Sequence, residues 1–240
     1  MKNPMIFCAA IPNEIKPLCR RLNLATPHAG SSLVKSAPSG DYPVQIAVSG
    51  VGRDRMEALL QEMSPDPVCC WVSIGFAGGL AGNLSTGDCL IGHNVMTGEG
   101  DAYSFDSFWR GKKSIGVSSN WLYCSRQAIT SAEQKKHLHK TTEASLVDME
   151  SAAVARHAQK RKEPFAWIRV VSDAAGDDVA PEMMKCLSPA GFPSAFSALK
   201  IILAKPALLL AFLKMGRRSS LCASNLADVI LLWMEKFSSK

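Results

Sequence analysis

The sequence predicts an α/β fold built around a single core. Apolar runs of strand length alternate along the chain with amphipathic segments of helical period. Several of these runs are apolar at consecutive positions, as expected for strands of a sheet that helices cover on both faces. The chain has 240 residues, of which 47% are apolar, and this is enough for one domain with a substantial core. We therefore expect a single domain over residues 1–240.

The predicted elements alternate up to Asp173. In the first half they are a strand over 5–11, a helix over 14–22, a strand over 42–49, a helix over 53–63 and a strand over 68–74. In the second half they are a strand over 89–95, a polar and aromatic covering loop over 98–113, a short strand over 114–118, a polar helix over 131–140, an amphipathic helix over 148–162 and a strand over 164–171. The run over 68–74 is apolar on both faces and predicts the centre of the sheet.

The carboxyl-terminal part of the chain has a different pattern. Apolar runs with helical spacing occur at 196–203, 206–213 and 226–237. The longest apolar stretch is interrupted by Lys205 and Pro206, so no segment reaches the roughly 20 residues of a membrane span. We expect a helical extension over residues 195–240 and no membrane anchor.

Composition and charge narrow the class of protein. The net charge is +6, and the basic residues are scattered apart from short clusters such as Lys135 and Lys136. Such clusters are typical of solvated helix ends, so we expect no nucleic-acid partner, although attraction to an anionic membrane surface stays open. The eight cysteines show no paired spacing, which indicates reduced thiols in the cytoplasm. The first apolar run is too short for a secretory signal.

Candidate ligand-binding positions follow the predicted strands, because ligands of α/β sheets gather beyond the carboxyl ends of strands. They are Glu14, residues 50–53, residues 75–79, residues 148–150, Ser172 and Asp173. The glycines at 75–79 let backbone amides approach a ligand, or they simply form a tight turn after the strand. Their spacing is not that of a dinucleotide site and no phosphate-loop motif occurs, so we expect no cofactor. His137 and His139 have no neighbouring ligands, so we expect no metal site.

Acidic residues open the predicted helix over 148–162. Asp148 and Glu150 precede its apolar face, where carboxylates favour the positive end of the helix dipole, so helix capping is one interpretation of the pair. The sequence around them, LVDMESAAVA over 146–155, provides a second interpretation. It resembles the ribose-binding segment of the purine nucleoside phosphorylase and methylthioadenosine nucleosidase superfamily, in which a Met-Glu pair opens a helix of small residues.

Three further motifs resemble the same superfamily in the same order. FAGGL over 76–80, followed by Gly87 and Asp88, resembles its central glycine-rich signature. RVVSD over 169–173 resembles the strand end that binds the base, and Glu14 lies where nucleosidases keep a water-activating carboxylate. The resemblance runs from about residue 5 to residue 185 and implies a three-layer fold with a mixed central sheet flanked by helices.

The resemblance implies cleavage of the N-glycosidic bond of a purine nucleoside. Departure of the purine leaves positive charge on the ribose and negative charge on the base, so a carboxylate at the sugar and an acid near N7 both help. The implied catalytic residues are Asp173 and Glu14, and the implied substrate-binding residues are Met149, Glu150, Phe76, Ala77, Gly78 and Ser172. Ser172 orients Asp173 or simply ends the strand.

The nucleophile is water or phosphate, and the sequence favours water. The Gly-Asp-Pro-x-Arg segment of the phosphorylases is absent, and Ser73 and Phe76 stand where hexameric phosphorylases carry phosphate-binding Arg and Ser. Arg53 is the remaining candidate for phosphate binding, and its alternative is a solvated arginine in a first helical turn.

The segments 71–80 and 147–155 and the carboxyl-terminal extension resemble the hopanoid-associated nucleoside phosphorylase family. That family is assigned release of adenine from adenosylhopane, which implies a lipid-linked purine nucleoside as substrate and peripheral contact with the inner membrane. Apolar side chains of the extension would contact the lipid, or they cover the sheet or a subunit contact, and they are Ile201, Ile202, Leu203, Leu208, Leu209, Leu210, Phe212 and Leu213. The resemblance also implies a homodimer.

Two other enzyme activities and one nonenzymatic function are alternatives to this interpretation. The alternative enzyme is a methylthioadenosine or adenosylhomocysteine nucleosidase, followed by a futalosine-type hydrolase. A nucleoside-binding protein without activity would lack Glu150 or Asp173, and both are present.

Overall fold

The computed structural model describes residues 3–27, 35–39, 42–63, 67–106, 121–188 and 190–238. The strands within these residues are β1 (Met5–Ala9), β2 (Lys35–Ser39), β3 (Tyr42–Val48), β4 (Cys70–Gly79), β5 (Cys89–Gly92), β6 (Asn94–Thr97), β7 (Ala102–Ser104), β8 (Trp121–Cys124), β9 (Leu146–Asp148) and β10 (Phe165–Asp173). The helices are α1 (Pro12–Arg21), α2 (Arg53–Glu62), α3 (Ala132–Thr142), α4 (Ser151–Arg161), η1 (Pro181–Cys186), α5 (Ala195–Ala204), η2 (Pro206–Leu208) and α6 (Leu209–Ser238).

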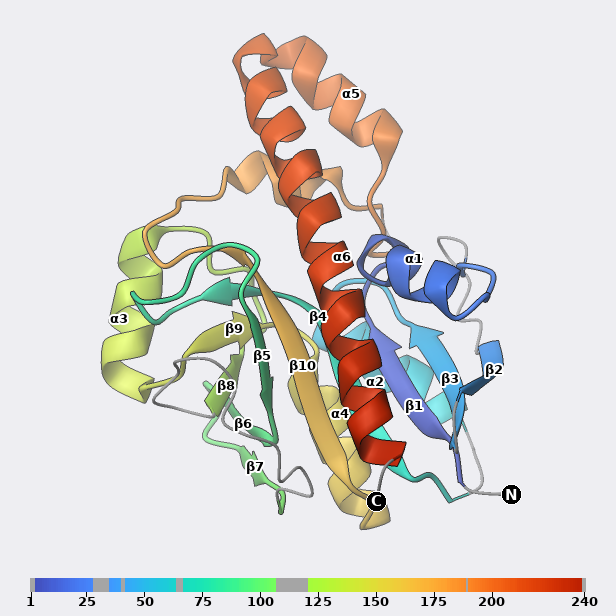
Figure 1. Ribbon diagram of the computed structural model, residues 1–240. Coiled ribbons are helices and arrows are strands. Elements are labelled where there is room, and N and C mark those ends of the chain that lie inside the picture. The colour runs from blue at the N-terminus through green and yellow to red at the C-terminus, as the bar shows by residue number, and fades with distance from the viewer. Residues whose placement is uncertain are drawn as a thin grey trace.

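The described strands form one mixed sheet. Its order is β2-β3-β1-β4-β9-β8-β6-β7, and β10 pairs with β4 and β5 outside this path. Parallel pairs join β1 to β3, β1 to β4, and β4 to β10. Antiparallel pairs join β5 to β10, and β9 to β4. Helices α1 and α6 cover one face, and α2 and α4 cover the other (Figure 1). The predicted α/β class with a mixed sheet flanked by helices is confirmed.

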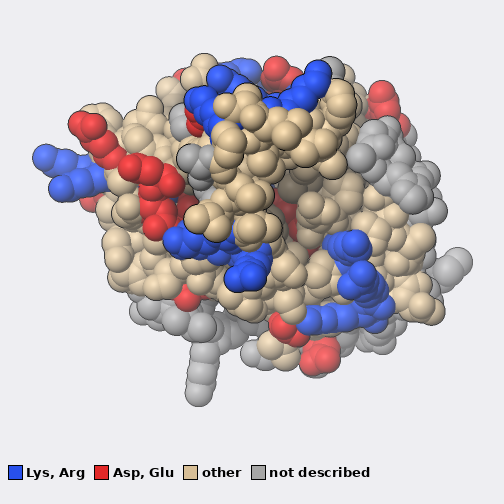
Figure 2. All heavy atoms as spheres, turned by 90° about the horizontal axis from the view of Figure 1, so that it is seen from above, with Lys and Arg blue, Asp and Glu red and all other residues tan. Residues whose placement is uncertain are grey.

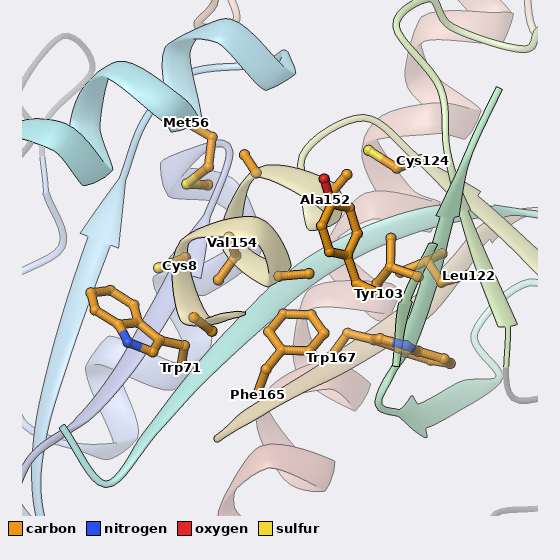
Figure 3. Close-up of a cluster of buried hydrophobic side chains, with 14 of the residues drawn as sticks. Cys8, Met56, Trp71, Tyr103, Leu122, Cys124, Ala152, Val154, Phe165 and Trp167 are labelled. Carbon is orange, nitrogen blue, oxygen red and sulfur yellow. The ribbon is translucent and has the colours of Figure 1, made fainter. Parts of the chain in front are cut away.

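Two apolar layers fill the space between the sheet and its helices. Under α4, the rings of Trp71, Phe165 and Trp167 pack near Val154 (Figure 3). The small buried residues of α4 let this helix approach the rings closely. Both indoles are satisfied, because the Trp71 ring nitrogen donates a 2.6 Å hydrogen bond to Glu163 and that of Trp167 donates a 3.0 Å bond to a backbone carbonyl.

Strand boundaries differ from expectation where pairing partners change. The strand expected over 68–74 continues to Gly79, because β10 and β9 supply backbone partners for the glycine segment. The strand expected over 89–95 breaks at His93, since β5 pairs antiparallel with β10 while β6 pairs parallel with β8. The helix expected from residue 148 begins at Ser151, because residues 146–148 form β9.

Some elements were not expected from the sequence at all. β2 and β8 were missed, and β7 lies inside the segment expected to be a covering loop. Each of these strands is only three to five residues long, which leaves little periodicity to detect. The strand expected over 114–118, and the loop beyond residue 106, lie outside the described residues.

The carboxyl-terminal extension divides into two parts with different surroundings. The helices expected at 206–213 and 226–237 belong mostly to one continuous helix, α6, after the short turn η2. The second half of α6 is in the core, where Cys222, Leu226, Ile230 and Trp233 are fully buried against α1 and β10. The first half projects together with α5 (Figure 1). No helix among the described residues is long and apolar enough to cross a membrane.

A glycine in β5 tests the packing against Trp167. A Cβ atom on Gly92 would lie 2.2 Å from the Trp167 ring, and this ring is 1% exposed and cannot move aside. We expect Gly92→Ala to lower the free energy of unfolding by about 1–3 kcal/mol or more, measured by urea denaturation. Gly82→Ala is the matched control, because a Cβ there meets nothing within 4 Å. Equal stability of the two variants would contradict this packing.

Candidate active site

A cavity of about 250 Å³ lies at the carboxyl ends of β1, β4 and β10. It is lined by Ala10, Ile11, Glu14, Val51, Phe76, Ala77, Gly78, Gln127, Ala128, Ile129, Thr130, Val147, Asp148, Met149, Glu150, Ser172, Asp173, Val179 and Leu187. Figure 2 shows acidic atoms at the bottom of a hollow on this side of the molecule. Every catalytic and substrate-binding residue that the resemblance implied lines this cavity, whereas Arg53 and the apolar residues of the carboxyl-terminal extension do not.

Glu14 lies on α1 at the floor of the cavity and is 5% exposed. One carboxylate oxygen accepts a 2.8 Å hydrogen bond from the Phe76 amide, and the other accepts 3.1 Å bonds from the amides of Ala10 and Ile11. Burial raises the pKa of Glu14 above its ordinary value, although these amides and nearby Arg169 oppose the shift. A carboxylate with a raised pKa is a better proton acceptor near neutral pH.

Met149 and Glu150 connect β9 to α4 beside Glu14. Glu150 is 6% exposed and accepts a 2.7 Å hydrogen bond from the amide of Gly52. Burial raises the pKa of Glu150, and the negative charge of Asp148 raises it further. The side chain of Glu150 makes no capping hydrogen bond at the start of α4. The capping role belongs instead to Asp148, whose oxygens accept bonds of 3.0 and 2.7 Å from the amide and hydroxyl of Ser151.

A buried cation that the sequence argument did not single out lies beneath these carboxyl groups. Arg169 of β10 is 2% exposed, and its guanidinium forms an ion pair with Asp148 and donates a 2.7 Å hydrogen bond to Ser73. A Cβ on Gly75 would lie 2.6 Å from both the Arg169 guanidinium and the Glu14 carboxylate. Gly75 therefore keeps space open between the cation and the carboxylate. Arg169 is the first residue of the motif RVVSD, but the resemblance assigns a role only to the strand end, Ser172 and Asp173.

Asp173 lies at the end of β10 and lines the cavity. The Ser172 hydroxyl lies 2.5 Å from one Asp173 carboxylate oxygen, an arrangement suited to orienting the carboxyl group. The other oxygen forms an ion pair with Lys135, which is fully buried. The expectation that Lys135 belongs to a solvated basic cluster is wrong, because α3 turns this side chain inward. Gly78 leaves room here, since its Cβ would lie 3.3 Å from Asp173.

Arg53 is outside the cavity lining. Its guanidinium is 6% exposed and contacts the carboxylates of Glu57 at 3.1 Å, Glu99 at 2.9 Å and Asp101 at 3.9 Å. The alternative of a solvated arginine is wrong as well, because these three acidic partners enclose the side chain. Bound in this way, Arg53 has little capacity left for a phosphate ion.

Part of the cavity wall is apolar and was not anticipated from the sequence. Besides Phe76 and Val51, which lie in predicted candidate segments, it includes Ile11, Ile129, Val179 and Leu187, which come from loops and helix starts. Such residues carry no motif, so only the folded chain brings them together. A flat, largely apolar ligand with a few polar groups suits this lining.

The comparisons with known proteins agree with this geometry. Residues 117–187 match a family model described as the Phosphorylase superfamily. A 5'-methylthioadenosine/S-adenosylhomocysteine nucleosidase from Neisseria meningitidis is 19% identical, with a TM-score of 0.67, and the alignment covers 95% of this chain and 97% of that one. The chain has the fold of the nucleosidases. Its motifs and the family match over less than half of the chain support the same superfamily.

Two further solved structures share this fold. The 5'-methylthioadenosine/S-adenosyl homocysteine nucleosidase of Helicobacter pylori has a TM-score of 0.65 and 17% identity, covering 98% of this chain and 100% of that chain. The futalosine hydrolase of Helicobacter pylori strain 26695 has a TM-score of 0.64 and 16% identity, covering 97% and 98%. The likeness therefore extends over nearly all of each protein.

The raised pKa of Glu150 predicts a pH dependence of stability. The folded chain holds a proton on Glu150 at pH values above 4.5, its ordinary pKa, where the unfolded chain has released it. The free energy of unfolding should therefore fall as the pH rises through this range. We expect Glu150→Gln to flatten the fall between about pH 5 and pH 8, measured by urea denaturation of the unliganded protein.

Glu62→Gln is the control for this measurement. Glu62 is an exposed carboxylate on α2, so its replacement should leave the wild-type slope in place. Parallel slopes for the wild type and Glu150→Gln would show that Glu150 is not held protonated by the fold.

Proposed function

We propose that the protein cleaves the N-glycosidic bond of a purine nucleoside. The observation that carries this proposal is the convergence of Glu14, Glu150 and Asp173 on one cavity, from three different elements of the fold. The family match and the nucleosidase fold support the same activity.

Each side chain has a chemical role in this reaction. Glu150 binds the ribose hydroxyls and, in its ionised form, stabilises the positive charge that develops on the sugar, while Met149 packs against the sugar face. Asp173 donates a proton to N7 of the base as the bond between C1′ and N9 breaks, and Ser172 orients its carboxyl group. Ala77 and Gly78 present backbone next to the base, and Phe76 limits the space beside the ribose.

Water is the nucleophile that the cavity favours. The described lining residues include four carboxyl groups, those of Glu14, Asp148, Glu150 and Asp173, and no Lys, Arg or His. A phosphate dianion would find no basic side chain in this lining to bind it. A water molecule needs only an acceptor for its proton, and Glu14 has the raised pKa that this role requires.

We propose adenosylhopane as the substrate and adenine as the released base. The apolar residues Val179 and Leu187 line the cavity on the side where the chain continues into η1 and α5, which gives a hydrocarbon group at the 5′ position an apolar exit. This substrate places the enzyme in the cytoplasm at the surface of the inner membrane. The sequence resemblance adds a homodimer to the proposal. The alternative substrate is methylthioadenosine or adenosylhomocysteine, which the names of the similar solved structures favour.

Release of adenine without phosphate tests the proposed reaction. Purified protein is incubated with adenosylhopane, methylthioadenosine, adenosylhomocysteine and inosine, with and without phosphate, and the free base is separated by chromatography. We expect adenine release in phosphate-free buffer, fastest from adenosylhopane. A strict requirement for phosphate would overturn hydrolysis, and faster turnover of methylthioadenosine would overturn the proposed substrate.

Glu14→Gln tests the source of the nucleophile. The amide cannot accept the proton of water, so we expect the rate of base release to fall about 100-fold or more. Circular dichroism spectra and urea denaturation check that the variant is folded. An unchanged rate in a folded variant would remove Glu14 from the mechanism.

A further inference from the structure

Large apolar side chains are exposed on the part of the chain that projects from the domain. We call this part the apical hairpin: it comprises α5, η2 and residues 209–221 of α6. Its exposed side chains include Phe196 at 68%, Leu203 at 72% and Leu210 at 76%. Leu199, Leu209, Leu213, Met215 and Leu221 are also exposed. None of the described side chains of α5 is buried. Contiguous exposure of this kind marks an interaction surface.

The charges of this surface have one sign. Residues 194–227 contain no Asp or Glu and five basic residues, namely Lys200, Lys205, Lys214, Arg217 and Arg218. Two of these bind acidic residues of the domain, since Lys205 lies 2.6 Å from Glu182 and Arg218 lies 3.0 Å from Asp177. Figure 2 shows basic side chains around the tan atoms of this projecting part.

We propose that the apical hairpin inserts into the headgroup layer of an anionic lipid bilayer. Helices that lie in a membrane interface combine bulky apolar side chains with Lys and Arg in this way. A second copy of the chain is a poorer occupant, because it would bring Lys200, Lys214 and Arg217 against the same residues of the other copy. Insertion rather than spanning is consistent with the absence of a membrane-crossing helix among the described residues.

Insertion of the apical hairpin would orient the molecule so that the cavity faces the bilayer. The carboxyl ends of β1 and β10 and the apical hairpin lie at the same end of the molecule (Figure 1). Leu187, which lines the cavity, forms a β-bridge with Pro193, directly before the cap of α5. The inference deepens the proposed function. Only the link between membrane contact and a lipid-linked substrate rests on that function. The contact itself is tested without any substrate.

Cosedimentation with vesicles tests the contact. We expect the protein to sediment with vesicles of equal parts phosphatidylglycerol and phosphatidylcholine, and binding to weaken at high salt, because salt screens the basic residues. Leu203→Glu/Leu210→Glu should lower binding at least about ten-fold, since charged side chains resist insertion. Leu232→Glu is the matched control, because Leu232 is 56% exposed on α6 but lies outside the hairpin, and it should bind as the wild type does.

Three results would overturn the membrane contact. The first is absence of wild-type binding to anionic vesicles, and the second is undiminished binding by the double variant. The third is a double variant that changes from dimer to monomer in sedimentation velocity, which would assign the surface to a second copy. Adenine release from adenosylhopane is assayed separately, and its absence in the wild type would count against the proposed function alone.

A second inference rests on Lys135, whose burial is independent of the hairpin. Its ammonium donates to the Asp173 carboxylate, to the Ala174 carbonyl at 3.0 Å and to the Asp177 carbonyl at 2.9 Å. All three N–H groups of the ammonium are therefore used inside the protein. A buried lysine is costly, and this one is placed directly behind the proposed acid.

The geometry points to Lys135 as a positioning residue for Asp173, within the proposed function. Asp173 first takes a proton from water and leaves its ion pair with Lys135. When the bond between C1′ and N9 breaks, its electron pair stays on the purine, and the proton moves from the Asp173 carboxyl group to N7. The carboxylate that remains then lies against the Lys135 ammonium, which stabilises its negative charge. Lys135 thus acts only when the leaving group needs a proton.

A leaving-group comparison separates this role from a structural one. Lys135→Met should lower base release from a purine nucleoside at least about ten-fold, while cleavage of 4-nitrophenyl riboside, whose leaving group needs no proton, should change less than about two-fold. Lys135→Arg keeps the charge and should recover part of the rate. Equal losses on both substrates, or none, would overturn the role.

A double variant covers the case in which Lys135→Met folds poorly. Lys135→Met/Asp173→Asn should release the base no more slowly than Asp173→Asn alone, because the two residues act as one unit. Additive losses would contradict the coupling. If the wild type cleaves neither substrate, the proposed function fails instead.

Discussion

The ion pair between Arg169 and Asp148 is the contact on which the arrangement of the cavity depends. Four carboxyl groups line a space of about 250 Å³, and their mutual repulsion would favour an open or protonated site. The guanidinium lies beneath them, is nearly inaccessible to water, and lowers the pKa values of Glu14 and Glu150 against the effect of burial. Removal of this one cation would leave Asp148 buried without its partner, a loss typically worth about 3–5 kcal/mol.

The sheet topology explains why distant segments contribute to one site. Parallel pairing of β1 with β4, and of β4 with β10, brings the carboxyl ends of three strands to the same edge. Glu14 follows β1, the glycine segment ends β4, and Asp173 ends β10, so each functional group is supported by a strand of the core. Antiparallel β9 then brings Met149 and Glu150 against the end of β4.

The sequence allowed prediction of the fold class and of the motif residues that line the cavity, because both depend on local patterns, but not of the apolar part of the cavity wall. Apolar runs mark strands, and short motifs mark Glu14, Glu150 and Asp173 at their ends. It could not predict the environment of Lys135, since a lysine beside a second lysine on a polar helix is typical of a solvated face. The continuity of α6 was missed for a similar reason. Polar residues separate its two apolar runs, and the pattern does not show that one helix passes from exposed surroundings in its first half to buried surroundings in its second.

The length of α6 gives the molecule a mechanical property. Its 30 residues form a rod of about 45 Å, clamped over its second half between α1 and β10 and projecting freely from the domain over its first half. Near the clamp, the Cys222 thiol lies 3.3 Å from the carbonyl oxygen of Val171, two residues before Asp173. A lateral force on the projecting end is therefore transmitted along α6 to the buried half of the helix, which contacts the strand that holds Asp173.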